Sequence, residues 1–267
     1  MLYYTLPGSD SMDMIEYYAV KIDDQSDIDK RNGLFMHELL GYNGYEEDYI
    51  PEVSIEESIR KSISTFKSYQ DIKLFNKLDK GIENRTIQFM AIGDASFAFG
   101  TTMQPGESGT MIPVIICPEV FDKTSYAFLG HEFHHALKDL NIKERIVKDR
   151  LVDVIPMFYE RVCAFEEKEE KVSKEILKRR LILLEDIREL DNDDCTDQLK
   201  EFNSYYYALA LYTRYKKDKI LVLRLISRVL NGEISTLDLL NMLDIYNSDL
   251  DYVVSRELET IKQYVLD

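Results

Sequence analysis

Residues 128–140 read Phe-Leu-Gly-His-Glu-Phe-His-His-Ala-Leu-Lys-Asp-Leu and hold three of the four histidines of the chain. His131 and His135 are four residues apart, so on a helix both imidazoles project from one face and can bind one metal ion. Glu132 lies beside them, on the side where a metal-bound water would sit. The opposite face, which can be buried, is supplied by Leu129, Phe133, Ala136, Leu137 and Leu140. The stretch therefore predicts a helix that packs by one face and presents a metal site on the other.

A catalytic zinc site usually has three protein ligands and one open position. No histidine follows His135, so the third ligand must be a carboxylate. Glu160 is the preferred candidate, because it lies 25 residues after His135, early in a helix expected to begin at Pro156. The other candidates, on or just after the motif helix, are Asp139, Asp149 and Asp153.

Hydrophobic periodicity around the motif predicts a small sheet followed by helices. One amphipathic helix is expected over residues 54–78, ended by Gly81. Two to four strands are expected within residues 85–117, with the apolar runs 86–92 and 111–116 as the clearest. Pro113 suggests that the second run is an edge strand, since proline cannot donate to a ladder. Further helices are expected over 122–140, 143–154, 156–190, 196–217, 219–230, 236–246 and 250–265. The fold class predicted is α+β and predominantly helical.

Charge and length exclude several classes of protein. The 267 residues carry a formal net charge of −16. This charge argues against a nucleic-acid partner and against docking on anionic lipid, because both need a basic face. No run approaches the roughly 18–20 apolar residues of a spanning helix, and the N-terminus has no signal-peptide pattern. We expect a soluble, cytoplasmic protein with no membrane or nucleic-acid partner.

The pattern His131-Glu132-x-x-His135, with a glutamate on a second helix, resembles the gluzincin metallopeptidases of the thermolysin-like clan. The segment 158–167, Phe-Tyr-Glu-Arg-Val-Cys-Ala-Phe-Glu-Glu, is similar to the third-ligand segment of the thimet oligopeptidase and oligoendopeptidase family. The tyrosine-rich run 202–207 lies where that family carries substrate-facing tyrosines. The likeness covers about residues 110–215. It departs from the family at His134, which replaces a glycine, and at Glu201, which replaces a histidine.

The resemblance implies a zincin-like fold and a zinc-dependent peptidase acting on a peptide or protein. Residues 1–141 would form a lobe with a small twisted sheet and the motif helix, and residues 142–267 a helical lobe that carries the third ligand. An extended peptide would add as a strand beside residues 109–116. One Zn²⁺ per chain would be bound by His131, His135 and Glu160.

The resemblance also assigns roles to residues around the metal. Glu132 would be the general base. A tyrosine, Tyr206 or Tyr207, would stabilise the oxyanion, the alternative being plain helix packing. Glu167 shares a helix face with Glu160 and would orient a ligand histidine, unless it belongs to the solvated charged run 166–171. His134 is expected to hydrogen-bond locally or line the cleft.

Two competing functions use the same residues. A non-catalytic, zinc-binding regulatory or interaction protein could be built on the same scaffold. A di-iron helical bundle would need a second Glu-x-x-His motif, and no other histidine of the chain has Glu three residues before it.

Overall fold

The computed structural model of the chain describes residues 27–41, 44–69, 72–92, 99–105, 111–141, 151–189, 196–245 and 249–267. The helices are α2 (Ile55–Tyr69), α3 (Ile72–Glu83), α4 (Ser125–Asn141), α5 (Val154–Glu166), α6 (Glu170–Glu189), α7 (Thr196–Lys217), α8 (Lys219–Leu230), α9 (Thr236–Met242) and α10 (Leu250–Leu266), with a further helix over residues 27–40. The strands are β1 (Glu52–Val53), β2 (Gln88–Ile92), β3 (Gly100–Pro105), β4 (Met111–Pro118) and β5 (Phe121–Asp122). The predicted α+β, predominantly helical class is confirmed. Among the described helices, none combines the length and the apolar run that crossing a bilayer requires.

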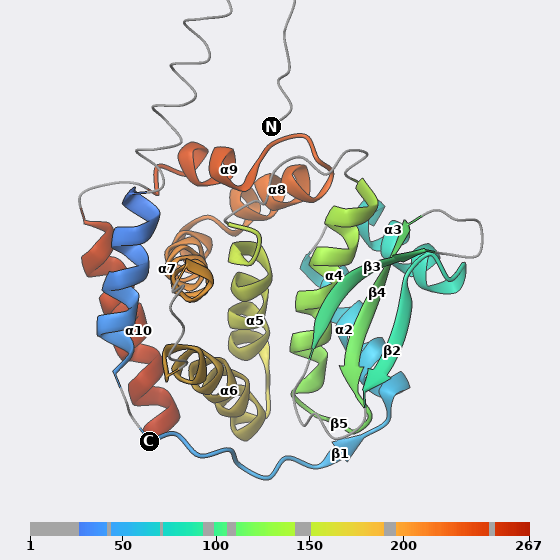
Figure 1. The fold of residues 1–267 in the computed structure, drawn as a ribbon, viewed down its shortest axis with the longest axis horizontal. Coiled ribbons are helices and arrows are strands. Elements are labelled where there is room, and N and C mark those ends of the chain that lie inside the picture. Colours follow the sequence, from blue (N-terminus) through green and yellow to red (C-terminus); the bar gives the residue numbers. More distant parts are fainter. Residues whose placement is uncertain are drawn as a thin grey trace, which may run out of the picture.

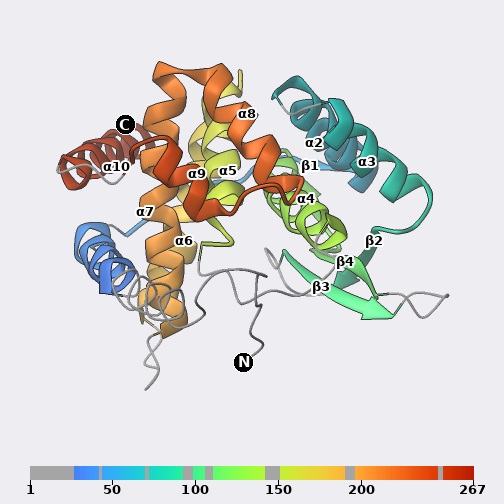
Figure 2. The same cartoon turned by 90° about the horizontal axis from the view of Figure 1, so that it is seen from above.

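The molecule has a sheet half and a helical half, with α4 and α5 packed against each other where they meet (Figures 1 and 2). β2, β3, β4, α2 and α3 lie on the α4 side, and α6, α7 and α10 lie on the α5 side. The helix of residues 27–40 lies beside α10, because Lys262 donates hydrogen bonds to the carbonyl oxygens of Leu39 and Leu40 at 2.6 and 2.7 Å. Residues 27–40 therefore pack on the helical half, although they belong to the N-terminal lobe predicted for residues 1–141.

The three-stranded sheet has the order β2–β4–β3, with β2 parallel and β3 antiparallel to β4. The prediction of an edge strand at Pro113 is wrong, because β4 is central. Pro113 pairs with Met103 of β3, and β2 pairs with β4 only from Val114 onward. The missing N–H of the proline therefore lies outside the β2 ladder, where it is tolerated. Among the described residues, β2 and β3 are the edge strands of this three-stranded sheet.

Two of the predicted helices are each divided. The segment 54–78 contains the end of α2 at Tyr69 and the start of α3 at Ile72. The segment 156–190 is interrupted at Glu167, whose ψ of 132° leaves the helical region. The Glu167 carboxylate accepts hydrogen bonds from the amides of Lys168 and Glu169 at 2.8 and 3.2 Å. This side chain thus satisfies amide groups at the start of the next helix, which allows the chain to turn.

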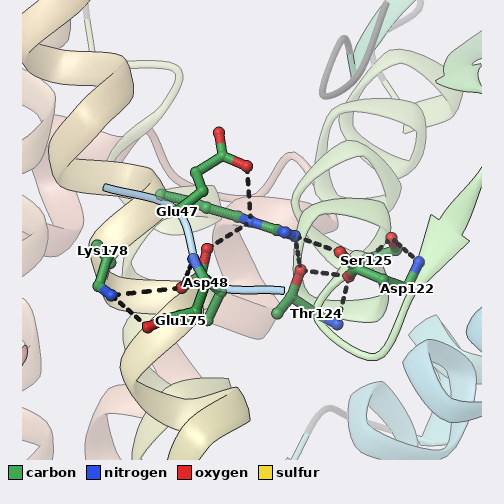
Figure 3. A network of polar contacts seen from close by, with 8 residues as sticks. Glu47, Asp48, Asp122, Thr124, Ser125, Glu175 and Lys178 are labelled. Carbon is green, nitrogen blue, oxygen red and sulfur yellow. Dashed lines mark hydrogen bonds and ion pairs between the residues drawn. The ribbon is translucent and has the colours of Figure 1, made fainter. Parts of the chain in front are cut away.

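A polar network joins the two halves near the start of α4 (Figure 3). Arg179 of α6 is 4% exposed, and its guanidinium lies 2.7 Å from Asp122 and 3.0 Å from Glu175. Beside it, Lys178 pairs with Asp48 at 2.5 Å, on the segment 44–53 that runs between the halves. Because Asp122 lies directly before α4, the network ties the start of the motif helix to α6.

Candidate metal centre

α4 is held in place by a buried apolar face and by one close contact with α5. The buried residues of this helix include Leu129, Phe133, Ala136 and Leu137, each 0% exposed. At Gly130, an added Cβ would lie 2.0 Å from Cε1 of Tyr159 on α5. The absence of a side chain therefore allows α5 to approach α4 at the residue just before His131.

The ligand atoms of His131, His135 and Asp153 converge. The two histidine Nε2 atoms lie 3.1 Å apart. Oδ1 of Asp153 lies 3.0 Å from Nε2 of His135 and 3.6 Å from Nε2 of His131. A tetrahedral zinc with bonds of about 2.0–2.1 Å would hold its ligand atoms about 3.3 Å apart. The three distances bracket this value, so the residues fit one zinc ion with its fourth position open.

Glu160, the preferred third ligand in the sequence, lies on the other side of the His131 ring. Its Oε1 is 2.6 Å from Nδ1 of His131, whereas the converging atom of that histidine is Nε2. Arg180 of α6 donates to both carboxylate oxygens of Glu160, at 2.5 and 2.7 Å. Burial opposes ionisation of Glu160, but Arg180 and His131 hold its pKa below the usual range. Glu160 is thus placed to orient a ligand, and Asp153 takes the position expected of it.

The remaining alternatives for the third ligand are separated by the structure. Asp153 is the residue before α5, where the chain re-enters the core after the motif helix. Asp139 lies in the last turns of α4 and is absent from the converging group of the described residues. Asp149 lies outside the described residues.

Glu132 is buried beside the converging atoms. Its Oε2 accepts a hydrogen bond from the hydroxyl of Thr101 on β3 at 2.7 Å, and its Oε1 lies 3.9 Å from Nε2 of His131. β3 therefore brings an edge of the sheet directly to the predicted base. Thr101 was not anticipated in the sequence, because the segment before residue 104 shows no clear strand pattern.

The electrostatics of the group favour positive charge. Burial alone would lower the pKa of His131, but Glu160, Asp153 and Glu132 together raise it to about 10. Glu201 of α7 is near enough to interact electrostatically with Asp153, His131 and His135; burial raises its pKa, and the charge of Asp153 raises it further. Four carboxylates thus surround the two imidazoles, which is an environment suited to a divalent cation.

His134 makes the local hydrogen bond that the sequence predicted. Its Nδ1 lies 2.6 Å from the carbonyl oxygen of Gly130, so the ring donates along its own helix. The ring packs against Phe66 and Tyr159, with centroids 5.1 and 5.0 Å away. Burial lowers the pKa of His134 to about 3, so the ring is neutral at pH 7.

The two predicted catalytic tyrosines point toward other partners. Tyr206 donates to Asp251 of α10 at 2.6 Å, and the hydroxyl of Tyr207 accepts from Asn32 of the helix over 27–40 at 2.7 Å. Both hydroxyls therefore join α7 to its neighbours on the side away from α4 (Figure 2). In the same run, Tyr205 interacts electrostatically with Arg180 and Glu160, behind the histidines.

Glu167 lies against the start of α4. Its carboxylate accepts from Lys61 of α2 at 2.7 Å and from the hydroxyl of Tyr126 at 3.0 Å. Tyr126 precedes His131 by more than one helical turn, so Glu167 braces α4 instead of contacting a ligand. The carboxylate that contacts a histidine is that of Glu160, which Arg180 holds in place. No sequence pattern identified Arg180; only the general rule that a buried carboxylate needs a cationic partner could have suggested such a residue.

Comparison with family models, with curated proteins and with solved structures finds no match for this chain.

Proposed function

We propose that the protein is a zinc-dependent peptidase with a zincin-like arrangement of sheet edge, motif helix and third-ligand helix. The observation that carries the proposal is the spacing of the three ligand atoms, 3.0–3.6 Å, beside the carboxylate of Glu132. The ligands proposed are His131, His135 and Asp153. This set differs from the one that the gluzincin resemblance implies, because Asp153 replaces Glu160.

Each neighbouring residue would have a defined task. When bound, zinc would polarise a water molecule and the scissile carbonyl. Oε1 of Glu132 would take a proton from this water and later pass it to the leaving amine nitrogen. The Thr101 hydroxyl holds Oε2 of the same carboxylate, which leaves Oε1 facing the ligands. Glu160 accepts from Nδ1–H of His131, so Nε2 is the nitrogen of that ring from which a metal would displace the proton.

The peptide would lie along β3. This strand is an edge among the described strands, and Thr101 connects it to Glu132. Main-chain groups on an unpaired edge can pair with an extended peptide, as in other cases of strand addition. The docking strand proposed is therefore β3, in place of residues 109–116, because β4 already pairs on both sides.

The proposal is tested by metal content and peptide cleavage together. Elemental analysis of untagged protein should give about one zinc per chain. Glu132→Gln should retain the zinc and lower kcat/KM on a mixed peptide library at least 100-fold, since general-base catalysis contributes about 10²–10⁴-fold. Glu119→Gln, which removes the same charge from an exposed position after β4, is the control and should keep full activity.

The outcomes separate the proposal from its alternatives. Zinc binding without any cleavage would support the non-catalytic, zinc-binding protein. Equal cleavage by Glu132→Gln and the wild type would assign the activity to another site or to a contaminant. Absence of zinc after reloading would overturn the metal centre itself.

A further inference from the structure

A cavity of about 700 Å³ lies among α5, α6, α7 and α10, on the helical half of the molecule. None of His131, His135 and Asp153 lines it. Its volume is within the range of about 300–1,000 Å³ that is usual for small-molecule sites. The cavity is thus a second candidate site, separate from the metal centre.

Four cations line this cavity, although the chain carries a net charge of −16. They are Arg161, Lys216, Lys217 and Arg256. Lys217 and Arg256 form no ion pair with any residue that the structure describes. Concentrated positive charge in a concave site attracts anions even when the protein as a whole repels them.

The two carboxylates of the cavity wall are already paired. Glu257, 5% exposed, accepts from Arg161 at 2.8 Å and from Lys216 at 2.6 Å. Glu167 pairs with Lys61 at 2.7 Å. Two cations therefore remain uncompensated in the wall, and a ligand with one or two negative charges would complement them.

Aromatic side chains give the cavity a second character. Phe165 and Tyr252 line the cavity and are 61% and 69% exposed, so both rings keep apolar area that a ligand could cover. The ring of Tyr212 is buried, with the guanidinium of Arg161 4.3 Å and the ring centroid of Phe165 5.9 Å from its own centroid. The wall of the cavity therefore offers ring faces beside its cations.

We propose that the cavity binds a small molecule that carries an anionic group, a phosphate or a carboxylate, on an aromatic ring. Lys217 and Arg256 pair with the anion. Phe165 and Tyr252 cover the ring, whose burial would remove their exposed apolar area from water.

The test is calorimetric titration of metal-free protein, prepared with EDTA so that phosphate cannot bind zinc. Phenyl phosphate and benzoate are the probes for the two anionic groups, and at least one should bind once per chain. Inorganic phosphate and benzyl alcohol, each lacking one part of the ligand, should bind at least tenfold more weakly than the better probe.

Two pairs of variants locate the binding. Arg256→Gln should weaken the better probe at least fivefold, whereas Arg224→Gln, the same charge change on α8 outside the cavity, should not. Tyr252→Ala should weaken it at least threefold, whereas Tyr49→Ala, at a position 77% exposed elsewhere, should not.

Three results would overturn the proposal. The first is absence of saturable binding by both aromatic probes. The second is an equal effect of Arg256→Gln and Arg224→Gln, which would reveal long-range charge alone. The third is inorganic phosphate binding as tightly as phenyl phosphate, which would remove the ring from the site. None of these results bears on the metal centre, because the titration uses metal-free protein.

Discussion

The choice between Asp153 and Glu160 as third ligand can be settled by the order of two zinc affinities. Asp153→Asn and Glu160→Gln each replace a carboxylate by an amide of the same shape. In the structure, Oδ1 of Asp153 faces the Nε2 atoms of both histidines, whereas Glu160 contacts only Nδ1 of His131. We therefore expect Asp153→Asn to weaken zinc binding more than Glu160→Gln does.

The magnitudes follow from these two positions. Structural zinc sites with four ligands bind with about 10–16 kcal/mol, so one ligand is worth about 2.5–4 kcal/mol if the share is even. Loss of Asp153 should then weaken zinc binding about 100- to 1,000-fold. Partners that orient a ligand histidine typically contribute about 10–100-fold, or about 1.4–2.7 kcal/mol, which is the loss expected for Glu160→Gln.

The assay is competition for zinc with a chromophoric chelator, carried out at one pH and one salt concentration. Thermal unfolding of the metal-free proteins controls for folding, because Glu160→Gln leaves Arg180 in a buried position with a weaker partner. If Glu160→Gln loses zinc while Asp153→Asn binds it like the wild type, the reasoning is refuted and Glu160 is the ligand. Equal losses would also contradict it, because a residue that only orients a histidine should contribute less than a direct ligand.

Two further predictions concern the frame around the site. Gly130→Ala should destabilise the protein by about 2 kcal/mol or more in urea unfolding, because the added Cβ would meet Tyr159; this cost outweighs a gain of about 1 kcal/mol in helix propensity. The control is Gly100→Ala, whose Cβ would have no atom within 4 Å and which should leave stability nearly unchanged. Equal stability of the two variants would disprove the close contact. Thr101→Val should lower kcat/KM about tenfold or more with zinc content unchanged, since a hydrogen bond to a charged group is worth about 1.5–3 kcal/mol. If this variant loses its zinc, or if it keeps the activity of the wild type, Thr101 does not orient Glu132.

Most of the helices could be predicted from the sequence because they have one apolar face. α8 and α10 match the expected ranges closely, and their periodicity is clear. The sequence allowed more than two strands in this region but did not locate β3, because Gly-Thr-Thr-Met-Gln-Pro has no apolar alternation and ends in proline. Its place in the sheet comes from pairing with β4, which is a tertiary contact.

The orientation of the side chains around the candidate metal centre was harder to predict, because the helices that carry them are buried on nearly every side. All but two of the residues from Val154 to Phe165 of α5 are buried, and residues 202–212 of α7 are buried throughout. A helix buried on every side has no polar face to show how it is rotated about its axis. The sequence could therefore bring Glu160 near the histidines without showing which ring nitrogen it contacts. For the same reason it could not show that Tyr206 and Tyr207 face away from α4.

The geometry of the candidate centre is set by contacts outside it. The start of α4 is tied to α6 through Asp122 and Arg179, and its middle is packed against α5 at Gly130. His131 is held from behind by Glu160, which Arg180 fixes in turn. Each of these contacts joins protein to protein, so the spacing of the ligand atoms does not depend on the metal to create it. A site prepared in this way would suit the proposed catalysis, because the three side chains would need little rearrangement if a metal or a substrate bound.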